Sequence, residues 1–310
     1  MNKKYLLAAV IALGPMAANA GVIATSFLSV SELELQIEPG NVGDGEGDPL
    51  LTITPLTTTR GESAKATFGM DSAGSDLGVA DVPYACIGPD CASLTADQND
   101  MEDLAGIQAA VDNSLSYAFA DASLGDGSVL DGTGSGYTMA GASIKEMNSG
   151  GASGNSNINS NTLFVLELNL FEDASFSLAG AFDAFIDAAI SADVAADSNF
   201  AATSTANADL TVTVTSQTGN FSASSSLSDL AGIVLTDTAV DFPGLGDLVA
   251  RTYEDQTFEL SPIALTADLY QVVISQSSFA QVSQVPAPAT LALFSLGLLG
   301  LGAAARRKKA

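Results

Sequence analysis

The sequence predicts an all-β protein, an antiparallel β-sandwich of jelly-roll type. From Gly21 onward, short runs of Val, Ile, Thr, Phe and Leu alternate with clusters of Gly, Asp, Ser and Asn, a pattern typical of strands separated by turns. Within 164–170 every even position is apolar, and the odd positions include Glu167 and Asn169, as in a strand with one buried face. The region between the two chain ends is long enough to form one domain with a substantial core.

Other segments show the same features, and one of them fits two structures. In 182–196 the even positions are apolar and several odd ones are Asp, which indicates a strand, although Phe182, Phe185 and Ile186 also fit a helix. The strand is preferred because a helical face would include Asp193, whereas the alternating face stays apolar. The further strand segments are 50–59, 114–120, 162–171, 208–215, 221–227 and 263–279.

A stretch of nearly pure Ser, Asn and Gly spans 148–161. Such a composition offers few apolar side chains for a core and is typical of flexible segments. We therefore expect a loop or linker there, between an N-terminal half and a more regular C-terminal half of the domain 21–284.

The N-terminus reads as a secretory signal helix over residues 1–20. Lys3 and Lys4 precede an apolar run, and the run ends in Ala18-Asn19-Ala20, the order of charge, apolar segment and small residues that signal peptidase reads. We expect cleavage after Ala20 and export of the rest of the chain.

The charge distribution is strongly acidic. The chain carries 36 acidic and 10 basic residues and a formal net charge of -26, and six of the basic residues lie in the two end segments. Such a surface repels nucleic acid phosphates and anionic lipid headgroups. Nucleic acid is therefore excluded as an expected partner.

The two cysteines agree with export. Cys86 and Cys91 flank Ile87-Gly88-Pro89-Asp90, a turn-prone stretch that brings the thiols together. In an exported chain this spacing predicts one disulfide that closes a small loop.

The C-terminus combines a proline motif, an apolar helix and a basic end. Val285-Pro286-Ala287-Pro288 precede an uncharged run over 290–305, which as a helix would be about 24 Å long, near the thickness of a bilayer core. The final cluster would stay cytoplasmic, leaving the acidic domain outside. This cluster consists of Arg306, Arg307, Lys308 and Lys309.

These three parts, in this order over residues 285–310, resemble the PEP-CTERM sorting signal. The Val-Pro-x-Pro motif, the Gly- and Leu-rich helix and the Arg/Lys end all fit, although Ala287 stands where that family usually carries glutamate. The resemblance implies an inner-membrane tether, cleavage near residues 286–288 by an exosortase-type enzyme, and transfer to the cell surface or extracellular matrix. Proteins with this signal commonly accompany exopolysaccharide production.

Little in the middle of the chain points to catalysis. Histidine is absent, which excludes Ser-His-Asp and Cys-His mechanisms and most zinc sites. Paired carboxylates of a glycosidase remain open. Asp44, Glu46 and Asp48 alternate as in the first half of a calcium loop, but the twelfth position from Asp44 is Pro55 instead of an acid.

We therefore expect a noncatalytic, exported surface or matrix protein, structural or adhesive, that is associated with exopolysaccharide or biofilm and needs no cofactor, with calcium as the one candidate. Two alternatives remain open. One is a secreted, carboxylate-dependent enzyme that acts on glycans, and the other is a calcium-dependent carbohydrate-binding module.

Overall fold

A computed structural model describes most of the region between the two chain ends. The described residues are 21–39, 52–75, 84–91, 115–125, 129, 132–144, 150–167, 174–190, 200–218, 221–231, 233–240, 247–260, 262–266 and 268–286. The predicted signal helix over 1–20 and the predicted membrane helix over 290–305 lie outside them. No helix within the described residues is long and apolar enough to cross a membrane.

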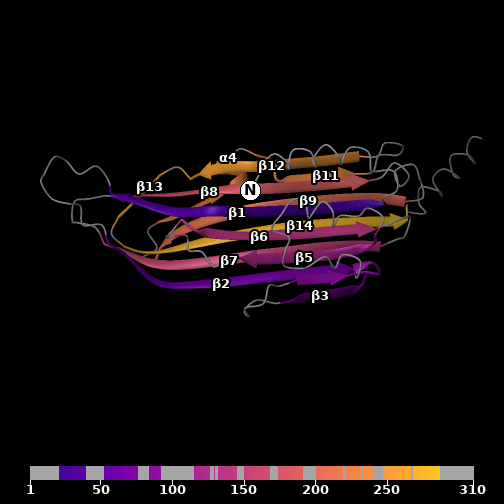
Figure 1. Ribbon diagram of the computed structural model, residues 1–310, viewed down its shortest axis with the longest axis horizontal. Helices are drawn as coiled ribbons and strands as arrows, with labels where there is room; N and C mark the ends of the chain where they lie inside the picture. Colours follow the sequence, from indigo (N-terminus) through magenta and orange to yellow (C-terminus); the bar gives the residue numbers. More distant parts are fainter. Residues whose placement is uncertain are drawn as a thin grey trace, which may run out of the picture.

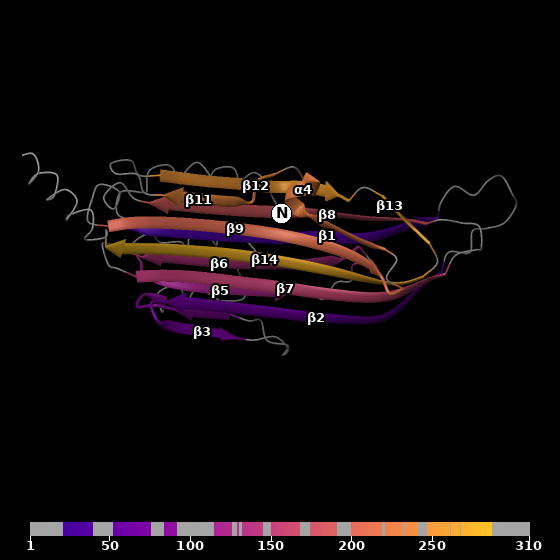
Figure 2. The ribbon, with the colours of Figure 1, turned by 180° about the vertical axis from the view of Figure 1, so that it is seen from behind.

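The strands form two antiparallel sheets that extend along the long axis of the molecule (Figures 1 and 2). Sheet A consists of β12 (Asp247–Glu259), β8 (Ala174–Ile190), β1 (Val22–Pro39), β6 (Gly134–Ile144), β5 (Tyr117–Leu124) and β4 (Tyr84–Ile87), in that spatial order, with β13 (Ile263–Leu265) also paired to β8. Sheet B consists of β10 (Ser222–Ser226), β9 (Phe200–Ser216), β14 (Asp268–Pro286), β7 (Gly150–Glu167), β2 (Thr52–Phe68) and β3 (Asp71–Ser75), with β11 (Thr236–Val240) also paired to β9.

The predicted all-β, antiparallel class is confirmed, whereas the jelly-roll connectivity stays a prediction. The chain crosses repeatedly between the sheets: β7 and β9 belong to sheet B and the intervening β8 to sheet A. Among the described residues the helical content is a single short helix, α4 (Leu227–Ala231).

Residues 182–190, for which the sequence fits both a strand and a helix, form a strand as part of β8. Its even positions, such as Phe182 and Ile186, are buried against sheet B, and its odd positions include the partly exposed Asp183 and Asp187. In a helix, Asp183 and Asp187 would lie on the same side as some of the apolar residues. In the strand, these aspartates lie on the face opposite to the apolar even positions. Residues 191–196 lie outside the described part of the chain.

The prediction of a loop or linker over 148–161 is wrong from Gly150 onward. This stretch forms the first part of β7, which pairs with β14 on one side and β2 on the other. Its composition lacks the apolar side chains of a usual strand, but two neighbours satisfy its backbone groups. Its small residues face a part of the interior that has little room for larger ones.

Side-chain size varies along the interior. At the end of the molecule where β14 begins, the core holds Phe176, Leu178 and Tyr270. Toward the end of β14 many buried positions are alanine, although Ile144 and Ile190 are also buried there. Buried alanines there include Ala24, Ala118, Ala120, Ala140, Ala142, Ala152, Ala202, Ala206 and Ala280. Small side chains let two sheets approach closely, and the interior remains dense because their volume matches the gap.

Polar side chains connect the two sheets where they lie close. Ser26 of β1 donates a hydrogen bond to the backbone carbonyl of Asn207 in β9, and Gln276 of β14 donates through Nε2 to the carbonyl of Leu28 at 2.7 Å. The hydroxyls of Thr138 and Ser278 lie 2.9 Å apart. Short side chains that reach the opposite backbone satisfy buried polar groups and fix the relative register of the sheets.

At Gly154 the backbones of the two sheets approach closely. A Cβ added to this residue in β7 would lie 1.9 Å from the carbonyl oxygen of Phe119 in β5 and 3.1 Å from that of Gly141 in β6. Both atoms belong to backbone in the opposite sheet, so no side-chain rotation relieves the clash. Glycine is therefore required at this position for the sheets to pack as they do.

We predict that Gly154→Ala lowers the free energy of unfolding by about 3 kcal/mol or more, because the sheets must separate locally to admit one methyl group. Urea unfolding followed by circular dichroism measures the change. Gly151→Ala is the matched control, since it lies on the same strand and its added Cβ would be 3.6 Å from the nearest atom, the Val282 carbonyl oxygen. Equal stability of the two variants would contradict the close approach.

Candidate functional site

The last strand leads directly into the proline motif. In β14, Gln284 pairs with Gly150 of β7 and with Ala202 of β9, and Val285 and Pro286 still pair with β9. Strand structure thus continues two residues past the boundary predicted at 284. The remaining predicted processing and stop-transfer residues lie outside the described part of the chain: Ala287, Pro288, Arg306, Arg307, Lys308 and Lys309.

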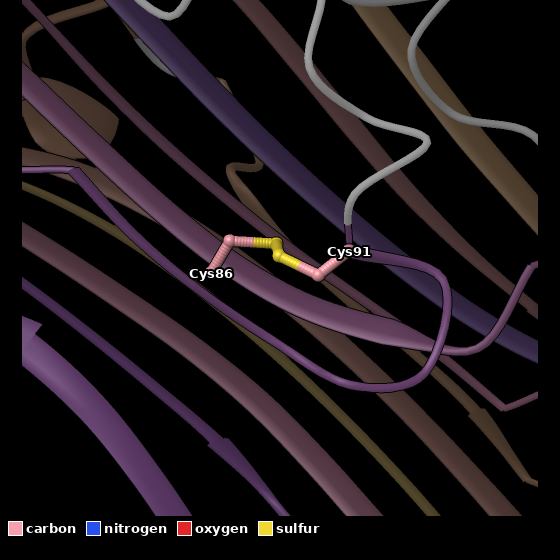
Figure 3. Close-up of a disulfide and its surroundings, with 2 residues drawn as sticks. All are labelled: Cys86 and Cys91. Carbon is pink, nitrogen blue, oxygen red and sulfur yellow. A yellow bond between two sulfur atoms is a disulfide. The ribbon is translucent and has the colours of Figure 1, made fainter.

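The predicted disulfide is confirmed. Cys86, the third residue of β4, and Cys91 form a disulfide with a Cα–Cα distance of 5.9 Å (Figure 3). Gly88 adopts a φ of 127°, which side chains disfavour. Asp90 fastens the loop to the start of β5, because its Oδ2 accepts a hydrogen bond of 2.8 Å from the Ser116 amide. The disulfide therefore secures an edge of sheet A.

The outer face of sheet A carries a second, aromatic cluster. It lies on the odd positions of the strands, opposite the main core, and consists of Phe27, Tyr117, Phe119, Tyr137, Met139 and Phe185. Asp121 lies among these side chains, almost fully buried at 1% exposure, and its Oδ2 accepts a hydrogen bond from the Tyr137 hydroxyl at 3.2 Å. Burial raises the pKa of Asp121 to about 7.

A second carboxyl on the same face, Asp187 of β8, also has a raised pKa. Its Oδ1 is enclosed and has no hydrogen-bond partner among the residues that the structure describes. Burial, and next the charge of Asp237, raise the pKa of Asp187 to about 7. A carboxyl of this kind is partly protonated near neutral pH.

Asp121 and Asp187 do not form a catalytic pair. Their strands, β5 and β8, are separated by β6 and β1, so three strand spacings, about 14 Å, lie between them. Paired glycosidase carboxyls are separated by about 5 to 9.5 Å. The distance between Asp121 and Asp187 is therefore larger than the separation of the two carboxyls in a glycosidase.

The calcium candidates Asp44, Glu46 and Asp48 lie outside the described residues, so that site stays a prediction. Within the described ranges, no cluster of three or more Asp, Glu, Cys or His side chains is arranged to hold a metal ion.

A pocket that sequence reasoning missed lies at the end of the molecule where β14 begins. It has a volume of about 390 Å³, within the range of small-molecule sites. Its polar wall is built around Asp268, the first residue of β14. The lining comprises Ser216, Thr218, Phe221, Ala264, Thr266, Asp268 and Tyr270.

Hydrogen bonds hold Asp268 in place and ionised. Its Oδ2 accepts from the hydroxyls of Ser216 and Thr218, the latter at 2.7 Å, and its Oδ1 accepts from the Leu269 amide at 2.7 Å. The Ser216 and Thr218 hydroxyls together hold the pKa of Asp268 below its usual value. The wall therefore carries a fixed negative charge.

Two rings form the apolar side of this pocket. Phe221 packs edge-on against Tyr270, with ring centroids 6.4 Å apart. The Tyr270 hydroxyl donates to the Thr266 carbonyl at 2.9 Å, which fixes the ring. Nothing in the local sequence indicates this arrangement, because Ser216 and Asp268 are brought together only by the pairing of β9 with β14.

Comparison with known proteins identifies the C-terminal segment. Residues 284–308 match the PEP-CTERM protein-sorting motif. No curated protein and no solved structure matches the chain. The motif marks an exported protein that an exosortase processes, and in this chain it begins inside the last strand of the β domain.

We predict that Asp187→Asn removes part of the pH dependence of stability. Between the ordinary pKa of 3.8 and about 7, the folded chain retains a proton that the unfolded chain has released, so wild-type stability falls as the pH rises through this window. In the variant the fall between pH 4 and pH 8 is smaller by up to about 4 kcal/mol. Thermal unfolding across this range measures it.

Asp183→Asn is the control for this comparison. Asp183 lies on the same face of β8 and accepts a hydrogen bond from the Asp255 amide, and its replacement leaves Asp187 in place. This variant retains the wild-type fall in stability with pH. An unchanged pH dependence in Asp187→Asn would show that Asp187 is ionised throughout.

Proposed function

We propose that this chain is a noncatalytic, adhesive component of the cell surface or extracellular matrix that associates with exopolysaccharide. The proposal rests on one combined observation. The chain carries a sorting motif, and it also forms a long β-sandwich whose broad outer face is lined by hydroxyl and amide side chains. The chain is exported with a C-terminal sorting signal, so this face meets extracellular polymers.

The polar face belongs to sheet B. On β9 and β14 the odd positions point away from the buried core. Most of them are Thr, Ser, Asn or Gln, which exchange hydrogen bonds with sugar hydroxyls. These side chains are Thr203, Thr205, Asn207, Thr211, Thr213, Thr215, Gln271, Ser275, Ser277, Gln281 and Ser283.

The dimensions of this face suit a polymer. β9 has 17 residues and β14 has 19, so the face extends over about 60 Å along the molecule (Figure 2). A surface of that length can contact many sugar units of one chain at once. Many weak contacts acting together retain a polymer more strongly than any single contact does.

The separation of the two carboxyls with raised pKa also supports the noncatalytic role. The face that carries Asp121 and Asp187 separates them by about 14 Å, wider than paired glycosidase acids. We therefore favour adhesion over the glycan-acting enzyme.

We predict that two negative charges on the polar face weaken association with exopolysaccharide. Thr205 and Gln281 pair across β9 and β14, so Thr205→Glu with Gln281→Glu places two carboxylates on neighbouring strands, where they displace sugar hydroxyls and repel acidic polymer. Co-sedimentation of the purified full-length chain with the producing cells' exopolysaccharide measures the loss. Thr257→Glu on the exposed edge strand β12 is the control. Unchanged co-sedimentation of the double variant would contradict adhesion through this face.

Sorting has its own test. An epitope placed in the exposed turn at Met70, between β2 and β3, leaves β14 intact. We predict that cells carrying the exosortase release a shortened chain to the surface or medium. Replacing Arg306, Arg307, Lys308 and Lys309 with Gln blocks this step, and the full-length chain accumulates in the inner-membrane fraction.

Lys65→Gln is the matched control, since it removes a basic residue within β2 and leaves the tail unchanged. It behaves as wild type in the fractionation. A wild-type chain that stays at full length in the inner membrane would show that the tail is a permanent anchor.

A further inference from the structure

We propose that the Asp268 pocket binds a single uncharged sugar unit, for example at the end or a branch of a polysaccharide. This inference rests on the proposed function and extends it, because it assigns a defined binding site in addition to the adhesive face of sheet B. The chemistry of the pocket wall, its apolar side and its position each contribute to the assignment.

The polar wall presents hydrogen-bond acceptors. The hydroxyl oxygens of Ser216 and Thr218 lie within hydrogen-bond distance of Oδ2 of Asp268 and 2.8 Å from each other, so three oxygens with spare lone pairs are gathered at this wall. The Asp268 carboxylate has further acceptor capacity beyond these two hydroxyls and the Leu269 amide. A ligand in this pocket must therefore bring several donors, as a ring that carries hydroxyl groups does.

The charge and the apolar side narrow the class of ligand. The ionised Asp268, in a chain of net charge -26, repels phosphates and sugar acids. A bare calcium ion requires six to eight oxygen ligands and gains nothing from Phe221 and Ala264, which line the same pocket. The C–H face of a sugar ring packs on such an aromatic surface while its hydroxyls reach the polar wall.

The ring of Phe221 is positioned before a ligand arrives. It is partly exposed, and its edge-on contact with the buried Tyr270 limits its orientation. Tyr270 is in turn held by the backbone of Thr266, since its hydroxyl donates to the Thr266 carbonyl at 2.9 Å. A pre-formed site loses less conformational entropy on binding.

The pocket lies at the opposite end of β14 from the sorting motif. Asp268 begins this strand and Pro286 ends it, about 60 Å apart along the sheet. Figure 1 shows the same arrangement, with β13 and the start of β14 at one end and the tip of β14 at the other. The end that carries the pocket therefore points away from the segment on which the sorting enzyme acts.

The test uses purified full-length chain in detergent and titrates it with glucose, galactose and N-acetylglucosamine, with saturation-transfer NMR as the readout. At least one of these neutral sugars shows saturable binding, and glucuronate does not bind. Asp268→Asn keeps the shape of the side chain, removes its charge and weakens binding by about tenfold. Phe221→Ala also weakens binding, through loss of the ring face.

Asp209→Asn is the matched control. Asp209 also accepts a threonine hydroxyl, from Thr211 at 2.9 Å, but it lies on the outer face of β9 and outside the pocket, and its replacement leaves binding unchanged. Thermal unfolding verifies that every variant is folded. Absence of saturable binding by all three sugars, or equal binding by Asp268→Asn and wild type, would overturn the proposal. So would a calcium-induced rise in melting temperature that Asp268→Asn abolishes, because the pocket would then be a cation site.

The experiments distinguish a failure of the pocket assignment from a failure of the proposed adhesive function. If the pocket binds no sugar while the chain still co-sediments with exopolysaccharide through sheet B, the adhesive role stands and the pocket assignment is lost. If monosaccharide binding depends on Asp268 but co-sedimentation is absent, the pocket stands and the adhesive face is lost.

Discussion

The close approach of the two sheets at Gly154 limits the size of the side chains that the neighbouring interior can hold. The backbone of β7 lies so near that of β5 that one methyl group does not fit, and buried alanines surround this point. Small side chains bury little apolar area each, so the interior at this end relies on dense packing and on hydrogen bonds between sheets. Ser26 and Gln276 supply such bonds to opposing carbonyls.

Strand β14 connects the functional elements that the chain contains. It lies in the middle of sheet B, paired along its length with β7 and β9. The pocket forms where it begins, the hydroxyl- and amide-rich face that we propose to be adhesive follows its odd positions, and the sorting motif starts where it ends. The paired strand thus sets the distance between the pocket and the start of the sorting motif, because a strand that is hydrogen-bonded on both sides does not fray readily.

Much of this arrangement was predictable from local patterns. Alternation of apolar and polar residues identified β8 and β14 as strands because a period of two is a property of the backbone itself. The signal-like N-terminus, the sorting motif and the Cys86–Cys91 pair could likewise be read locally. The sequence did not reveal the first part of β7, residues 150–161, since Ser, Asn and Gly resemble a loop until two neighbouring strands pair with them.

The class of fold and the C-terminal sorting signal depend on residues adjacent along the chain, so local patterns in the sequence predict both. Packing between distant segments, in contrast, makes residues 150–161 a central strand, places Asp121 and Asp187 far apart on one face, and brings Ser216 and Asp268 together in a pocket. Those features depend on strand order and register, which arise from packing between residues that are distant in sequence.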